Sequence, residues 1–178
     1  ARIHRALSEI PAKDWDALHE GRNPFVAHAF LAGLEQTDCL RADWGWTPYH
    51  LALWDGDALV AAAPAYLKDN SHGEFVFDHA WAHAHERHGL SYFPKWLGAV
   101  PYSPVTGPRL LACSYATKRP LLSAIEDLIR EQHQTYGTTI ILVTHNVFQA
   151  RRLATRVALL LDGGLVEVGP TAQLFDSP

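Results

Sequence analysis

Four histidines stand close together in one stretch of this chain, at His79, His83, His85 and His88. If the stretch is helical, His79, His83 and Glu86 share one face, because residues three and four apart are neighbours on a helix. Two imidazoles and a carboxylate can hold a divalent metal. His85 and His88 are only three apart, which does not fit the metalloprotease zinc motif. Such histidines more often form a polar, hydrogen-bonded helix face. We therefore predict that this stretch binds no metal. If it did, His79, His83 and Glu86 would be the candidate ligands.

Other catalytic templates are missing from the sequence. It contains no G-x-x-x-x-G-K-[ST] loop for nucleotide phosphates, no G-x-G-x-x-G and no G-x-S-x-G turn for a nucleophilic serine. Cys39 and Cys113 lack the neighbouring charges that make a thiol reactive, so we expect half-buried small residues there. Trp44-Gly45-Trp46 can line a ligand cleft, although packing in the core or at its rim is the commoner role of such aromatics.

The composition is that of an ordinary globular chain. Its 178 residues are 48% hydrophobic, a length that suits one compact domain or a little more. Fifteen Lys and Arg against nineteen Asp and Glu give a net charge of −4, so nothing favours DNA as a partner. No apolar run approaches the ~20 residues of a membrane span, and the first residues lack the apolar stretch of a signal peptide. Because the chain has two cysteines and no disulfide framework, we expect it to be located in the cytoplasm.

Strand and helix patterns alternate along the chain, which predicts a mixed α/β (α+β) fold. A hairpin is expected from residues 49–54 and 58–67, around the turn Asp55-Gly56-Asp57. A second hairpin is expected from 157–161 and 165–168. Further strands are expected at 2–7, 95–100, 108–111 and 139–144. Helices are expected at 11–19, 27–36, 75–88, 120–134, with Pro120 as the first residue, 146–154 and 171–175.

Several motifs in the first 124 residues resemble those of one family. They are Asn23-Pro24-Phe25, His28-Ala29-Phe30-Leu31, Leu34-Glu35, Trp46-Thr47-Pro48-Tyr49-His50-Leu51, Phe77-Asp78-His79-Ala80-Trp81-Ala82, Glu86-Arg87, Gly89, Tyr92-Phe93-Pro94-Lys95 and Pro104-Val105-Thr106-Gly107-Pro108-Arg109-Leu110-Leu111. In this order they resemble the FemAB-like proteins of the GNAT acyltransferase superfamily, which are associated with peptidoglycan biosynthesis or recognition. His85 and Phe93 stand where such sequences have tyrosines.

That resemblance implies a GNAT-like mixed sheet flanked by helices, and transfer of an acyl or aminoacyl group to an amine. The implied donor is acyl-CoA or aminoacyl-tRNA, and the implied acceptor is a small molecule or a cell-wall precursor. The family carries two such folds and this chain has length for one, so we expect an incomplete domain whose activity and catalytic residues the sequence leaves open. The implied substrate-binding residues are Asp78, His79, Trp81, Arg87, Tyr92, Lys95 and Arg109. Lys95 and Arg109 suit an anionic group, or an ordinary ion pair.

The last 54 residues resemble a different family. Thr138-Thr139-Ile140-Ile141-Leu142-Val143-Thr144-His145-Asn146, Ala150-Arg151-Arg152-Leu153-Ala154 and Leu161-Asp162-Gly163-Gly164-Leu165-Val166-Glu167-Val168-Gly169-Pro170 are similar to the last part of an ABC-transporter ATPase subunit. His145 matches that family's switch histidine, which contacts the nucleotide γ-phosphate. The phosphate loop, the signature motif and the acidic Walker B strand are missing, so we expect no ATPase activity and a non-functional His145.

The two resemblances together predict a chimera. Residues 1–124 would be a partial GNAT-like domain, and 125–178 an appended helix-strand-helix-hairpin tail of P-loop ATPase type. Three functions stay open: a FemAB-like transferase domain, a remnant of an ABC ATP-binding protein, and a non-catalytic α/β module. Because both parts of such a chimera are incomplete, we expect that a protein partner supplies the elements that they lack.

Overall fold

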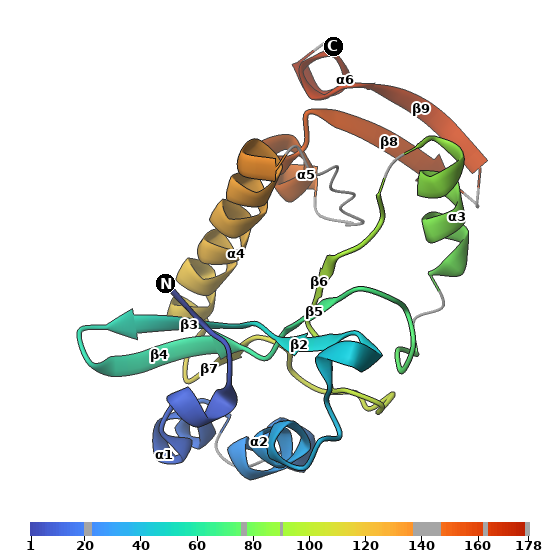
Figure 1. Ribbon diagram of the computed structural model, residues 1–178. Coiled ribbons are helices and arrows are strands. Elements are labelled where there is room, and N and C mark those ends of the chain that lie inside the picture. Colours follow the sequence, from blue (N-terminus) through green and yellow to red (C-terminus); the bar gives the residue numbers. More distant parts are fainter. Residues whose placement is uncertain (20–22, 76–77, 90, 137–146, 162–163, 177–178) are drawn as a thin grey trace. The chain divides into compact units, whose positions relative to one another are not determined.

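The computed structural model describes residues 1–19, 23–75, 78–89, 91–136, 147–161 and 164–176 (Figure 1). The contacts between residues divide the chain into two units, Ala1–Ile125 and Glu126–Pro178. Each unit is described by itself.

A four-stranded antiparallel sheet with the order β1-β3-β4-β7 forms the centre of the first unit. Its core is the predicted hairpin of β3 (His50–Asp55) and β4 (Ala58–Ala63), which turns at Gly56 with a φ of 58°. β1 (Arg2–His4) pairs with β3, and β7 (Leu111–Ala112) pairs with β4. Both edge strands are therefore much shorter than the central pair.

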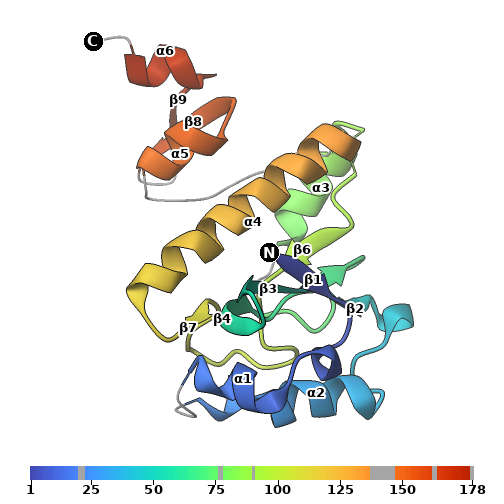
Figure 2. The same cartoon turned by 90° about the vertical axis from the view of Figure 1, so that its left-hand side faces the viewer.

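Alternate residues of the hairpin face two different helical layers. Ala52 and Ala62 belong to the apolar cluster formed with Leu7, Trp15 and Leu31, below the sheet. Helices α1 (Ala12–Ala17) and α2 (His28–Gln36) supply that layer, close to their predicted positions (Figure 2). The hairpin residues Leu51, Ala61 and Ala63 instead pack against Leu121 of α4 on the opposite face. This period of two is the reason why the hairpin can be apolar on both faces.

A second antiparallel sheet has the order β2-β5-β6 and consists of β2 (Trp46–Pro48), β5 (Tyr66–Lys68) and β6 (Lys95–Leu97). The prediction of one continuous strand over 58–67 is wrong, because the strand breaks at Pro64, which has no N–H for a strand ladder. Next to it, the Ala65 N–H donates to His50 Nδ1 at 3.1 Å. β5 then starts in the second sheet. α3 (His79–Arg87) lies between β5 and β6 in the sequence, and Gly89 follows it with a φ of 67°.

The longest helix, α4 (Tyr115–Tyr136), runs through Pro120. The prediction that Pro120 opens the helix is therefore wrong. Ser114 provides the start instead, since its hydroxyl accepts from the Thr117 N–H at 3.3 Å. Pro120 therefore lies inside the helix, where it cannot donate to the Ala116 carbonyl and where its ring crowds that carbonyl. Three short 3₁₀ turns complete the first unit, η1 (Leu7–Glu9), η2 (Pro24–Val26) and η3 (Ala42–Trp44).

The second unit contains the end of α4, α5 (Val147–Leu153), the hairpin of β8 (Arg156–Leu161) and β9 (Gly164–Pro170), and α6 (Thr171–Asp176). The predicted hairpin and final helical turn are confirmed. Glu126 of α4 is buried and forms an ion pair with Arg152 of α5. The predicted strand 139–144 and His145 lie outside the described residues.

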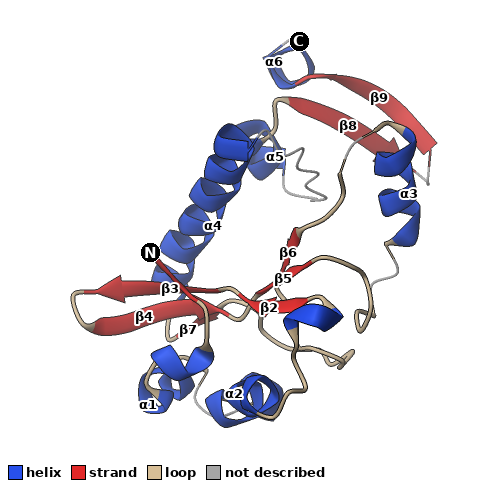
Figure 3. Cartoon of the chain, viewed as in Figure 1, coloured by secondary structure: helices blue, strands red, loops and turns tan. Residues whose placement is uncertain are grey.

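The predicted α+β fold class is confirmed, with antiparallel sheets flanked by helices (Figure 3). Among the helices that the structure describes, none is long and apolar enough to cross a membrane.

Candidate functional site

Asp78 is the centre of a buried polar cluster at the start of α3. Its backbone carbonyl, rather than its side chain, accepts the N–H groups of Trp81 and Ala82 in the first turn of the helix. The carboxylate is therefore available to other partners. Ser71 Oγ donates to Oδ1 at 2.6 Å, and the Tyr92 hydroxyl donates to Oδ2 at 2.7 Å. Lys95, the first residue of β6, forms an ion pair with the same carboxylate. The loop before α3 and the segment 92–95 after it thus meet at the Asp78 carboxylate.

Lys95 serves two carboxylates in this cluster. Its Nζ lies 2.7 Å from Glu74 Oε2, in addition to its contact with Asp78. The side chains of Glu74 and Asp78 are only 3% and 10% exposed, so both charges are largely removed from water. A single ammonium between two buried carboxylates is held firmly, because losing it would leave both anions unpaired.

The electrostatics keep Asp78 ionised. Burial raises the pKa of its carboxyl group, but hydrogen bonds from Lys95, Ser71 and Tyr92 outweigh burial and hold the pKa at about 2. Burial, followed by the hydrogen bond to Asp78, raises the pKa of the Tyr92 hydroxyl well above its usual range. At neutral pH the cluster therefore contains an anion that is a poor base and a phenol that keeps its proton.

A second lysine lies beside this cluster. Lys68 of β5 is fully buried, with its Nζ 4.0 Å from the centre of the Trp46 ring, opposite to it on β2. The ammonium donates to the His72 carbonyl at 3.1 Å. Burial lowers the pKa of Lys68, with a further contribution from Lys95, whereas Glu74 and Asp69 oppose the change.

A cleft of about 370 Å³ adjoins the cluster at Glu74. Its volume lies within the range of small-ligand sites, roughly 300–1,000 Å³. The walls come from the β5–α3 loop, the end of β6 and the loop before β7, together with Trp46. They consist of Trp46, Gly73, Glu74, Phe75, Leu97, Gly98, Ala99, Val100, Ser103, Pro104, Val105 and Arg109.

The structure brings some of the predicted substrate-binding residues together. Asp78, Tyr92 and Lys95 form the cluster, and Arg109 lines the cleft. The Arg109 guanidinium donates to the Val105 carbonyl at 2.7 Å and to two further carbonyls of its own loop, so it holds the wall of the cleft in place. Burial lowers the pKa of Arg109.

Other predicted residues point to the exposed side of α3. His79, Trp81 and Arg87 are exposed, and Trp81 retains 46% of its surface. His83 and Glu86 are exposed as well, and no group of metal-ligating side chains occurs in the described part of the chain. His85 is the inward-facing histidine: its Nδ1 contacts the Trp81 carbonyl at 3.0 Å, and its ring packs edge-on against Tyr92.

Sequence reasoning missed Ser71, Glu74 and Lys68. Ser71 and Glu74 stand in a polar loop where nothing in their spacing singles them out. The sequence does contain a signal for the inner face of α3. Asp78 and His85 are seven residues apart, which is two helical turns and places both on the same side of the helix. Cys39 and Cys113 are exposed, so the expectation that they are half-buried is wrong. Both follow the end of an element rather than facing its packed side.

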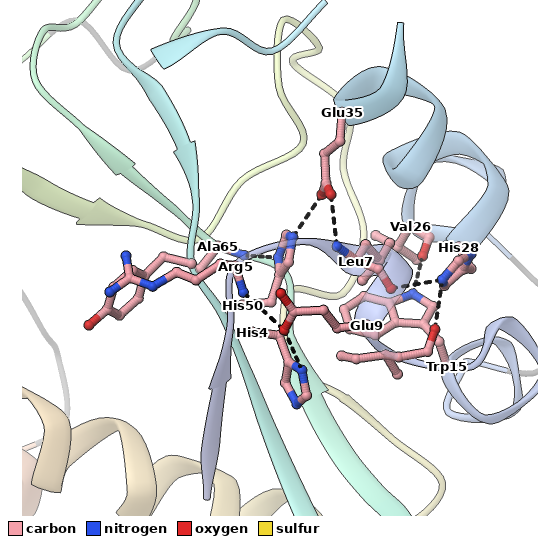
Figure 4. Close-up of polar contacts among 12 residues, drawn as sticks. His4, Arg5, Leu7, Glu9, Trp15, Val26, His28, Glu35, His50 and Ala65 are labelled. Carbon is pink, nitrogen blue, oxygen red and sulfur yellow. Dashed lines mark hydrogen bonds and ion pairs between the residues drawn. The ribbon is translucent and has the colours of Figure 1, made fainter. Parts of the chain in front are cut away.

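A separate polar network stiffens the first unit below the sheet (Figure 4). Glu35 of α2 accepts from the Leu7 N–H at 2.7 Å and from His50 Nε2 at 2.8 Å. Because His50 Nδ1 accepts the Ala65 N–H, its proton must be on Nε2, which makes the imidazole a donor to Glu35. Trp15 Nε1 donates to the Val26 carbonyl at 2.8 Å. These atoms are buried and already paired, so their role is structural.

Comparisons with known proteins agree with both resemblances. A model of the FemAB-like family, described as peptidoglycan biosynthesis/recognition, matches residues 6–160. The phosphate import ATP-binding protein PstB 2 of Mycobacterium tuberculosis is 54% identical over 54 residues, which are 30% of this chain and 19% of that protein. The methionine import ATP-binding protein MetN of Xanthomonas oryzae pv. oryzae is 37% identical over 76 residues, 41% of this chain and 23% of that protein.

MetN 1 of Staphylococcus aureus is 34% identical over 92 residues, 50% of this chain and 27% of that protein. The chain thus spans between 19% and 27% of the length of these curated relatives. No solved structure matches the chain.

Proposed function

Because this chain belongs to the FemAB-like family of peptidoglycan biosynthesis/recognition proteins, we propose that its first unit is a GNAT-like acyl- or aminoacyl-transferase domain. The acceptor would be an amine on a small molecule or a cell-wall precursor, bound in the cleft. The observation that carries this proposal is the buried cluster of Asp78, Lys95 and Tyr92, which reaches the cleft through Glu74.

Acyl transfer to an amine needs removal of a proton and stabilisation of a tetrahedral oxyanion. Asp78 is too acidic to take the proton, so in the proposal the proton passes to solvent water, and Asp78 positions Lys95 and Tyr92. The single hydroxyl proton of Tyr92 is donated to Asp78, so Tyr92 has a positioning role. The Lys95 ammonium, held between Asp78 and Glu74, supplies positive charge beside the cleft, which favours the developing oxyanion.

The exposed side of α3 suits the parts of a substrate that extend beyond the cleft. We assign His79, Trp81 and Arg87 to this outer contact, since an exposed indole and guanidinium can stack on and pair with a larger molecule. The donor by family resemblance is acyl-CoA or aminoacyl-tRNA. Such donors, and the free thiols of Cys39 and Cys113, agree with a cytoplasmic location.

A transfer assay tests the proposal. The purified chain is incubated with acyl-CoA or aminoacyl-tRNA and a cell-wall peptide that has a free side-chain amine, and the product is detected by mass. We expect transfer, and about a 100-fold lower kcat/KM for Lys95→Met. Lys13→Met, an exposed lysine on α1, is the matched control and should keep full activity. Absence of transfer with every donor, from a folded protein, would refute the proposal.

For the second unit we propose descent from an ABC ATP-binding subunit without ATPase activity, which makes the chain a fusion. The 54% identity to PstB 2 over 54 residues supports the descent, and the division of contacts after Ile125 supports a boundary near residues 124–125. The sequence lacks the phosphate loop, so a partner chain would have to complete any nucleotide site. Binding of Mg-ATP to the isolated chain at millimolar concentration would refute this assignment.

A further inference from the structure

The buried lysine of β5, Lys68, has a costly place in the fold. Its side chain is fully buried and its ammonium faces the ring of Trp46 at 4.0 Å. It forms no ion pair with any residue that the structure describes; Glu74 and Asp69 act on its charge only from a distance. An apolar side chain of similar length would fill this space without removing a charge from water. Packing alone therefore does not account for a lysine here.

The hydrogen bonds of Lys68 all go to the loop that follows β5. Its Nζ donates to the His72 carbonyl at 3.1 Å and to Asn70 Oδ1 at 3.4 Å. An ammonium has three protons, so it can serve both acceptors at once. Asn70 Oδ1 also accepts the His72 N–H at 2.9 Å, which closes a small network. One buried atom thus holds the residues on both sides of Ser71.

Ser71 belongs to the Asp78 cluster, although it lies outside any helix or strand. Its hydroxyl donates to Asp78 Oδ1 at 2.6 Å and accepts from Lys95 Nζ at 3.3 Å. A loop residue has no ladder of backbone hydrogen bonds to fix it. The restraint on Ser71 therefore comes from its two neighbours, which Lys68 holds.

The Ser71 hydroxyl has a measurable effect on the cluster. Burial raises the pKa of Asp78, and hydrogen bonds from Lys95, Ser71 and Tyr92 outweigh burial and bring it to about 2. If the hydroxyl moves away from the carboxylate, one of these three bonds is lost and the pKa of Asp78 must rise. The pKa of Asp78 thus reports the position of Ser71.

We propose that Lys68 is a positioning residue, which holds the backbone on both sides of Ser71 and thereby keeps the Ser71 hydroxyl on Asp78 and Lys95. Lys68 acts on the reaction only through Ser71, by helping to fix the Lys95 ammonium beside the cleft. This inference rests on the proposed function in that the cluster is the transferase site. It adds a residue, remote from the substrate, that the reaction needs.

A titration of Asp78 tests the proposal in the full chain. Its side-chain carboxyl signal in ¹³C NMR is identified by its absence from Asp78→Asn, and the change of its chemical shift with pH gives the pKa. We expect Ser71→Ala to raise this pKa from about 2 to about 3, because one hydrogen bond to the anion is lost. Lys68→Met and Asn70→Ala should raise it by a similar amount. Lys13→Met, at an exposed position of α1, is the matched control and should leave it unchanged.

A double variant shows whether Lys68 acts through Ser71. If it does, Lys68→Met combined with Ser71→Ala should have the same Asp78 pKa as Ser71→Ala alone. Two increases that add up would mean that Lys68 acts directly by its charge, and would overturn the proposal. An unchanged pKa in Lys68→Met would overturn it as well. If Lys68→Met fails to fold, as judged by circular dichroism, Asn70→Ala decides by the same comparison, alone and combined with Ser71→Ala.

The titration needs no transfer activity, so it separates this inference from the proposed function. Coupled pKa changes in a protein without transfer would keep the positioning role and refute the transferase. Transfer by a protein whose Asp78 pKa ignores Lys68→Met would refute only the positioning role. In an active protein, Lys68→Met should lower kcat about 10-fold and leave KM unchanged, because Lys95 acts in the transition state. An unchanged kcat would overturn the role of Lys68 in transfer.

Discussion

Replacing Asp78 by asparagine removes the anion on which three donors converge, and nearly preserves its shape. A carboxyl group whose pKa falls from 3.8 to about 2 on folding contributes about 2 kcal/mol at neutral pH, since one pKa unit corresponds to about 1.4 kcal/mol. Because the folded-state pKa is the lower one, this contribution is complete above about pH 5 and is lost as the pH falls through 4 towards 2.

Asp78→Asn should therefore be less stable than the parent protein by about 2 kcal/mol at pH 7 and by only about 1 kcal/mol at pH 3. The measurement is the free energy of unfolding in urea at several pH values, and the quantity compared is the difference between the two proteins. Other carboxylates cancel in that difference. Asp57→Asn, which changes an exposed turn residue, is the matched control and should show no such trend. A difference that stays constant from pH 7 to pH 3 would refute the assignment of Asp78 as an anion held by hydrogen bonds.

Three further predictions concern the packing that supports the site. His50→Leu should destabilise the protein by about 3 kcal/mol in urea unfolding, because it leaves the buried Glu35 carboxylate without its imidazole donor; a loss below 1 kcal/mol would contradict the network. Leu121→Ala should cost about 2–5 kcal/mol by the same measurement, since this fully buried side chain attaches α4 to the sheet, and a neutral effect would mean that α4 does not pack there. Gly73→Ala should lower the melting temperature by several degrees, because the new methyl group meets the Tyr102 ring at a positive φ; an unchanged melting temperature would contradict this geometry.

Local signals were enough to predict most elements of the first unit. The Asp55-Gly56-Asp57 turn specified the β3–β4 hairpin, and the apolar spacing of Phe30, Leu31 and Leu34 specified α2. The errors are at prolines. Pro64 separates two sheets, and a proline without an N–H inside a strand pattern is a signal for that break. The partner of the Ala65 N–H, His50, lies fifteen residues away and has no such local signal. Pro120 lies inside a helix whose start depends on Ser114.

The candidate site was only partly accessible to sequence reasoning. Asp78, Tyr92 and Lys95 belong to motifs of a recognisable family, whereas their assembly with Glu74 depends on how the β5–α3 loop folds against β6. The same holds for Trp46, which both fills a core cluster and lines the cleft. Its role depends on Gly73 and Tyr102, and such contacts between distant loops have no periodic signature.

The shortness of β1 and β7 bears on whether other copies of the chain can add strands to this sheet. Long, unpaired strand edges are templates on which other copies can add strands and form fibrils. Here the edge strand β1 offers only three residues for such pairing and the edge strand β7 only two. β1 also contains Arg2 and His4. β1 pairs only with residues 50–52 of β3, and β7 pairs only with Ala61 and Ala62 of β4, so the edges of the long strands near the hairpin tip are unpaired. The exposed tip bears Asp55 and Asp57, and these charges oppose the addition of another strand there.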